Sequence, residues 1–130
     1  MIEFHLDRAS GVASYLQLVH QVKRALRLGL LQPGDRLPTA KEAVAQVGIN
    51  PNTVLKSYRE LEREGLVEGR PGLGTFVLPG PLVRPAANTG LRRDLDAWLA
   101  AARAAGLDRE DIDALIDAAL TDTFREDHAP

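Results

Sequence analysis

Residues 50–65, NPNTVLKSYRELEREG, read as a helix whose first turn carries small hydrogen-bonding side chains instead of apolar ones. Asn50 can cap this helix, and Pro51 suits its first position, where no intrahelical N–H is needed. Five polar side chains are expected to point away from the core, namely Asn52, Thr53, Lys56, Ser57 and Arg59. Amides, hydroxyls and cations are the groups that contact base edges and phosphates, so this face suits nucleic acid.

Two apolar stripes indicate how this face is supported. The stretch SYLQLVHQVKRALRLG repeats apolar residues at helical spacing, and the helix at 50–65 carries a second stripe on the side opposite its polar face. The apolar positions are Tyr15, Leu18, Val22 and Leu26 in the first helix and Val54, Tyr58 and Leu61 in the other. Both helices are therefore expected to pack on a common core.

A third, short helix is predicted at residues 39–48, TAKEAVAQVG. Thr39 and Glu42 stand three residues apart, as a capping box requires, and Gly48 suits a left-handed C-cap. This helix and the next are joined by a tight turn, and the second begins with polar side chains. That arrangement is typical of a helix-turn-helix, in which the front of the second helix enters the major groove.

Residues 66–78, LVEGRPGLGTFVL, contain two short β-prone runs around Pro71-Gly72-Leu73-Gly74, which predicts a hairpin. A helix-turn-helix followed directly by a hairpin is the winged form. Arg70 stands beside the glycines of the tip, where it suits close approach to a phosphate backbone or a minor groove. Leu73 can contact only apolar surface, so the tip is expected to act mainly through its backbone.

Residues 15–77 resemble the DNA-binding domain of the GntR family of bacterial transcription regulators. The elements that carry the resemblance are Tyr15-x-Gln17, Gly29-x-Leu31-x-Pro33-Gly34-Asp35-x-Leu37-Pro38, Asn52-Thr53-Val54, Tyr58-x-x-Leu61-Glu62-x-Glu64-Gly65-Leu66 and Gly72-x-Gly74-Thr75-Phe76-Val77. They cover about half of the chain in one order. The INPNTV variant and the short tail are similar to the YtrA-like subfamily, whose C-terminal region is a small helical dimerisation element.

The resemblance implies DNA-binding roles by position. The second helix of the family usually begins Ser-x-Arg, and the matching positions here are Thr39 and Lys41. A lysine favours phosphate binding over a bidentate contact with guanine. Lys56, one turn into its helix, can reach a phosphate or a guanine edge. The complete predicted DNA-binding set is Thr39, Lys41, Asn50, Asn52, Thr53, Lys56, Ser57, Arg59, Arg70, Gly72, Gly74 and Thr75.

The tail is predicted to be a helical hairpin of residues 91–130, in which Gly106 joins the two helices and Asp108 caps the second. A hairpin of this size is too small to bury its own apolar faces, so we expect a second copy of the chain to cover them. The predicted dimer interface comprises Leu91, Leu95, Trp98, Leu99, Ile112, Leu115, Ile116, Ala119 and Leu120. Residues 79–90, rich in proline and glycine, are expected to form a linker.

Composition agrees with a soluble, cytoplasmic protein. The chain of 130 residues is 45 % hydrophobic and 26 % charged, contains no cysteine, and has neither a signal-peptide pattern nor a membrane span. The net charge of −2 conceals an asymmetry. Residues 1–80 hold ten Lys/Arg and eight Asp/Glu, a net of +2, whereas residues 81–130 hold six and ten, a net of −4. The first half therefore permits nucleic-acid binding.

These patterns predict a mainly α fold with a small β-hairpin: a winged helix-turn-helix domain at residues 1–78, the linker at 79–90, and a two-helix dimerisation element at 91–130. The leading interpretation is a dimeric repressor that binds double-stranded operator DNA with a palindromic sequence. Its own operon is one candidate target, and the resemblance to YtrA-like regulators implies transporter genes. The alternative is a protein-interaction module that uses the winged domain and the acidic tail.

Enzymatic activity is not expected, because the sequence has no nucleophile–base pair, metal-ligand cluster or phosphate-binding loop. We expect no cofactor and no metal. The acidic run that starts at Asp108 lacks the glycine and terminal glutamate of a calcium-binding EF-hand loop. Any small-molecule effector, whose identity the sequence leaves open, would need a pocket at the dimer interface or between wing and tail.

Overall fold

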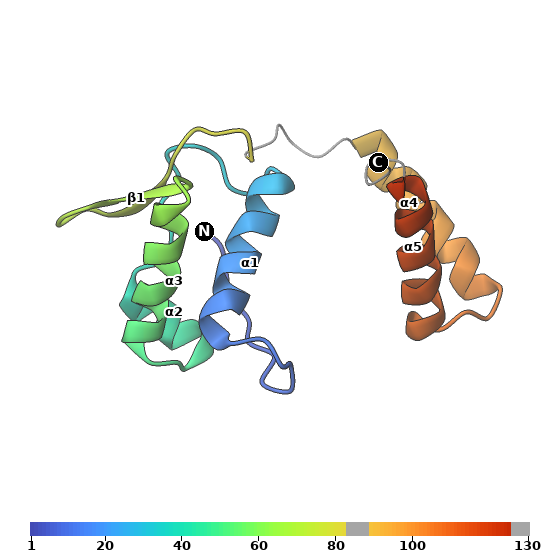
Figure 1. Ribbon diagram of the computed structural model, residues 1–130, viewed down its shortest axis with the longest axis horizontal. Helices are drawn as coiled ribbons and strands as arrows, with labels where there is room; N and C mark the ends of the chain where they lie inside the picture. The colour runs from blue at the N-terminus through green and yellow to red at the C-terminus, as the bar shows by residue number, and fades with distance from the viewer. Residues whose placement is uncertain (83–88, 126–130) are drawn as a thin grey trace. The chain divides into compact units, whose positions relative to one another are not determined.

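The computed structural model describes residues 1–82 and 89–125, which contain five helices and one hairpin (Figure 1). In chain order they are α1 (Ser14–Arg27), α2 (Ala40–Val47), α3 (Pro51–Arg63), β1 (Val67–Arg70), β2 (Gly74–Val77), α4 (Thr89–Ala104) and α5 (Arg109–Thr123). The chain divides into two compact units, residues 1–87 and 88–130. The predicted fold class, mainly helical with a small β-hairpin, is confirmed.

The core of the first unit lies among α1, α2 and α3. Leu18, Val22 and Leu26 of α1 are fully buried, as are Val54 and Leu61 of α3. The predicted apolar stripes therefore point inward, except that Tyr15 is only half buried. Segments outside the helices complete the core with Phe4, Leu31, Leu37, Val67 and Val77.

The helix ends follow the predicted capping chemistry. The Thr39 hydroxyl accepts a hydrogen bond from the backbone N–H of Glu42, and the Glu42 carboxylate accepts one from the N–H of Thr39. Gly48 ends α2 in the left-handed region at φ 67°. The Asn50 side chain accepts from the N–H of Asn52, and Pro51 opens α3. The turn between α2 and α3 is thus fixed by local interactions.

The wing is a two-stranded antiparallel sheet, in which Val67 pairs with Val77 and Arg70 with Gly74. Strand β2 lies between β1 and the segment before α2, to which it also bonds: the N–H of Leu37 donates to the carbonyl of Thr75 at 2.8 Å. On the other side, the Glu62 carboxylate of α3 accepts a hydrogen bond from the N–H of Gly69 at 3.4 Å. The base of the wing is therefore held from two directions.

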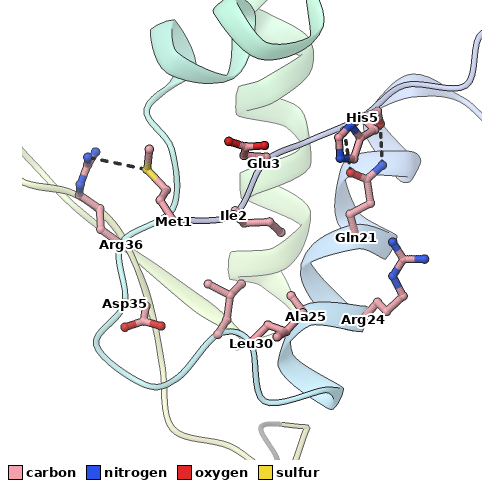
Figure 2. A pocket seen from close by; sticks show the side chains of 11 residues that line it. Met1, Ile2, Glu3, His5, Gln21, Arg24, Ala25, Leu30, Asp35 and Arg36 are labelled. Atoms are coloured by element: carbon pink, nitrogen blue, oxygen red, sulfur yellow. Dashed lines mark hydrogen bonds between the residues drawn. The ribbon is translucent and has the colours of Figure 1, made fainter. Parts of the chain in front are cut away.

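Residues 2–7 form an extended segment that three glutamine side chains hold in place. Gln46 of α2 accepts from the N–H of Phe4, whereas Gln21 of α1 both accepts from and donates to the backbone of His5 (Figure 2). Gln17 of α1 makes the same two-way contact with the backbone of Asp7. These amides satisfy backbone groups of the segment, and Phe4 lies in the core. No local sequence pattern predicts these contacts.

The second unit is a helical hairpin of α4 and α5. Asp108 caps α5 through a reciprocal pair of hydrogen bonds with Asp111, and Gly106 in the connection has φ 91°. Half of the predicted linker at 79–90, residues 83–88, and the end of the predicted dimerisation element, residues 126–130, lie outside the described residues. The last two predicted linker residues, 89 and 90, already belong to α4. Within the described ranges, no helix is long and apolar enough to cross a membrane.

Candidate nucleic-acid interface

The front of α3 presents the polar face that the sequence predicts. Asn52, Lys56 and Arg59 are exposed, and Thr53 is half buried. Asn50, the cap, is also exposed at the turn that precedes the helix. Asn52, Thr53 and Lys56 lie in the first two turns of the helix, so they can approach base edges while the remainder of α3 stays on the core.

Ser57 is a correction to the predicted face. Its side chain is fully buried, with 0 % exposure, so it cannot contact DNA directly. The hydroxyl donates to the carbonyl of Tyr15 on α1 at 2.8 Å and lies 3.1 Å from the carbonyl of Thr53. Ser57 is small and polar because α1 crosses α3 at this point, and its side chain ties the two helices together.

Lys56 is positioned by the same helix contact. Its ammonium lies 4.0 Å from the centre of the Tyr15 ring, within the range of a cation–π interaction. The half-buried tyrosine thus holds an exposed lysine at the front of α3. The helical spacing predicts a core position for Tyr15 and gives no sign of this role, because no local spacing relates residue 15 to residue 56.

The start of α2 adds a second group of predicted contacts, since Thr39 and Lys41 are both exposed there. The capping residue Glu42 also forms an ion pair with Arg36 at 3.0 Å. The backbone hydrogen bond from Thr39, followed by the side-chain bond from Arg36, lowers the pKa of the Glu42 carboxyl. Glu42 therefore stays ionised where it orders the helix start.

The wing tip exposes Arg70 and Gly72, whereas Gly74 and Thr75 are half buried. The Arg70 guanidinium lies 4.7 Å from the centre of the Phe76 ring and 3.7 Å from the Glu68 carboxylate. These contacts hold the cation on the surface of the wing. The guanidinium is held in place by weak, exposed interactions, which a contact with phosphate can replace.

Gly74 is required by its surroundings. Its φ is 126°, and a Cβ at this position would lie 3.2 Å from Cδ of Arg36. Arg36 therefore touches the wing with its aliphatic part and the start of α2 with its guanidinium. One side chain connects two regions that are both predicted to bind DNA, and the sequence motif around Gly34 and Asp35 gave no indication of this contact.

The acidic residues of α3 lie in its second half and have internal partners. Glu60 pairs with Arg63, Glu64 with Lys23 at 2.7 Å, and Glu62 holds the wing. The side-chain hydrogen bond from Arg63 lowers the pKa of Glu60. The charge along α3 is thus polarised, with cations and amides at the front and compensated carboxylates at the back. Only the front suits a polyanion.

A cavity of about 620 Å³ lies between the N-terminal segment, α1 and the loop that follows it (Figure 2). Its lining combines apolar side chains, among them Ile2 and Leu30, with charged ones such as Arg24 and Arg36.

Over residues 1–82 and 89–125, no three histidine, cysteine or acidic side chains come close enough to hold a metal ion.

The tail hairpin leaves an apolar groove of about 300 Å³ along α4 and α5. Its lining is Leu95, Trp98, Leu115, Ile116, Ala119, Leu120 and Thr123. Trp98 remains 42 % exposed there. Six of the nine predicted dimer-interface residues therefore line one surface, while Leu91 is exposed and Leu99 half buried elsewhere on α4.

Ile112 is a correction to the predicted interface. It is only 8 % exposed and is buried within the hairpin, as is Ala102 with 6 % exposure. Where two helices pack, the positions nearest the crossing form the internal core, and a spacing pattern alone does not separate these from positions left for a partner.

Known proteins share both the sequence and the fold of the first unit. The family described as bacterial regulatory proteins, gntR family, matches residues 14–77. The transcriptional repressor YtrA of Bacillus subtilis (strain 168) is 42 % identical over 72 residues, which make up 55 % of this chain and 55 % of YtrA. Across the first curated relatives the matched region is 52 % to 60 % of their length, so the chain spans about half of each.

Two solved structures extend the comparison. A transcriptional antiterminator from Listeria monocytogenes EGD-e has a TM-score of 0.60 at 29 % identity, covering 93 % of this chain and 92 % of that one. The DNA-binding domain of AraR, in complex with operator ORE1, has a TM-score of 0.50 at 26 % identity, covering 59 % of this chain and 94 % of that one. The likeness to AraR thus concerns the winged unit.

Proposed function

Since residues 14–77 belong to the GntR family of bacterial regulatory proteins, we propose that the chain is a sequence-specific, DNA-binding transcription regulator that acts as a dimeric repressor. The front of α3 enters the major groove. Lys41 and the wing residue Arg70 contact the phosphate backbone. Glycines at the wing tip permit close approach of the backbone to the duplex.

The observation that carries this proposal is the polarised surface of α3. Asn52 and Lys56 project from its first half and Arg59 from just beyond its middle, while the carboxylates of its second half are engaged within the protein. Support also comes from AraR, whose winged domain of similar fold was solved with operator DNA. YtrA, the relative at 42 % identity, is a transcriptional repressor.

Dimerisation through the tail is the second part of the proposal. The groove between α4 and α5 exposes large apolar side chains, including Leu115 at 47 % and Leu120 at 52 %. A second copy of the hairpin would cover them by the same surface on both chains. A twofold pair of winged domains would then read a palindromic operator, with half-sites spaced by whole helical turns.

Repression requires no further machinery, because a bound dimer can occlude a promoter. Regulation of the protein's own operon, with transporter genes as further targets, is the expectation that the resemblance to YtrA-like regulators provides. A small-molecule effector stays a prediction. Besides the dimer interface, the cavity lined by Ile2, Arg24 and Arg36 is a described space that such a molecule could occupy.

The testing experiment measures fluorescence anisotropy of a labelled duplex from upstream of the protein's own gene. A duplex of the same composition with a scrambled sequence is the control, and both are titrated from low to high salt. We expect preference for the native duplex and an affinity that falls steeply with salt, because each neutralised phosphate releases counterions.

If the operator does not lie upstream of the protein's own gene, selection from a random duplex library identifies the sequence that the protein prefers. Equal and weak binding to all duplexes, at every salt concentration, would reject the regulator and favour the alternative, a protein-interaction module.

A further inference from the structure

One large apolar side chain lies on the otherwise polar front of α3. Leu55 is 44 % exposed, whereas the buried residues of the helix are Val54, Ser57, Tyr58 and Leu61. At about 100° per residue, Leu55 lies about 60° from Asn52 and about 40° from Arg59 around the helix axis. It therefore lies on the side of α3 that carries Asn52 and Arg59, next to the buried stripe.

Among residues 1–82, Leu55 is not part of the hydrophobic core, and almost half of its side chain is open to solvent. It belongs neither to the buried core cluster nor to the partly buried apolar residues packed against that cluster. A leucine contributes to helix stability little more than the polar residues lysine and glutamine do, so helix propensity alone does not account for its presence here. The exposed part of this side chain is available for contact with a molecule that approaches the front of α3.

We propose that Leu55 is a specificity-determining residue that contacts the C5-methyl group of a thymine in the major groove. The inference rests on the proposed function, because it requires α3 to lie in that groove. The thymine methyl is the apolar group among the base edges of unmodified DNA in the major groove, and apolar side chains contact it. A polar or charged residue at position 55 would lose this discrimination.

Neighbouring side chains make the proposal more specific. The Asn52 amide, one turn before Leu55, has the donor and acceptor geometry for adenine, and the Lys56 cation suits phosphate. An amide that reads adenine and an apolar group that reads thymine together predict a half-site containing A·T pairs at the positions facing the front of α3.

The test removes the methyl group from the DNA and the side chain from the protein. With the operator obtained by selection, each thymine of the half-site is replaced in turn by deoxyuridine, which keeps the base-pairing groups and lacks only the methyl. Burial of one methyl predicts about fourfold weaker binding by the native protein at one thymine in each half-site. The Leu55→Ala variant should bind the unmodified operator and the operator with deoxyuridine at that position equally well.

Leu28→Ala is the matched control, because Leu28 is an exposed leucine of the same unit at the end of α1, with 39 % exposure against 44 % for Leu55. It should show the same sensitivity to deoxyuridine as the native protein. Thermal melting confirms that each variant is folded.

Two outcomes separate this inference from the proposed function. If the native protein prefers its operator but no single deoxyuridine weakens binding, or if Leu55→Ala keeps the native sensitivity, the role of Leu55 is rejected and the regulator stands. If selection yields no preferred sequence, both the regulator and the role of Leu55 are rejected.

Discussion

The ammonium of Lys56 lies 4.0 Å from the centre of the Tyr15 ring, so a residue at the start of α1 orients a proposed DNA contact on α3. Replacing Tyr15 with leucine should weaken operator binding about two- to fivefold, since an exposed cation–π interaction contributes about 0.5–1 kcal/mol. Tyr15→Phe keeps the ring and should keep the affinity. Anisotropy titrations of the two variants provide the measurement; equal losses for both would show that the ring does not position the lysine.

The basic residues of α3 and of the wing should contribute to binding through phosphates. Lys56→Ala and Arg70→Ala are expected to weaken binding and to reduce the salt slope of log affinity by about one for each protomer. Arg109→Ala is the control, because this arginine lies on α5 and pairs with Asp113. The proposed placement of the interface fails if both variants retain the native affinity and slope.

Ser57 should affect stability instead of salt dependence. Ser57→Ala removes a hydroxyl that bonds to the Tyr15 carbonyl, and the unfolding free energy should fall by about 1 kcal/mol. The salt slope of DNA binding should not change, because the side chain is buried. Urea denaturation and anisotropy measure the two effects separately, and a changed slope without a change in stability would contradict the assignment.

Introducing charged residues into the groove of the tail tests whether it is the dimer interface. Leu115→Asp combined with Ile116→Asp should produce monomers with reduced operator affinity, because two carboxylates cannot be buried against a second apolar groove. Ala118→Asp, on the same helix outside the groove lining, is the control. Analytical ultracentrifugation gives the mass, and circular dichroism confirms that the helices remain.

Leu120→Glu provides a milder variant at an exposed position of the same groove. A protein that stays dimeric with both the double substitution and Leu120→Glu would exclude the groove as the interface.

Acidification should weaken the start of α2. Folding lowers the pKa of Glu42 below the ordinary glutamate value of 4.5, so its stabilising contribution is present above that pH and is lost as pH falls through the folded value. The unfolding free energy of the native protein should therefore decrease in that window. Glu42→Gln should show a shallower pH dependence in parallel melts, and identical curves would exclude this carboxyl as a contributor.

Much of the first unit could be predicted from local patterns. The cap at Thr39, the left-handed Gly48 and the hairpin around Gly72 each depend on residues within a few positions of one another, and all three are present. Membership of the GntR family was also confirmed, because its motifs keep their order and spacing. The proposed roles of individual DNA-binding residues stay predictions.

The predictions that the structure corrects concern residues whose burial depends on packing between distant segments. Ser57 was placed on the free face, because the spacing of Val54, Tyr58 and Leu61 defines a stripe but not its width. Contact with α1 widens the buried arc of α3 to include the serine. Ile112 was misplaced for a related reason, since α4 and α5 use part of their apolar surface on each other.

The glutamine contacts to residues 2–7 have a consequence for how this protein can be altered. In an ordinary sheet each rung of hydrogen bonds joins two peptide groups, which every substitution except one to proline leaves in place. Here the rungs are the amides of Gln17, Gln21 and Gln46, so each one is separately encoded. Deamidation of Gln21 would retain the acceptor for the His5 N–H but lose the donor to its carbonyl. The attachment of residues 2–7 can therefore be weakened in separate steps, by substitution or deamidation of one glutamine at a time.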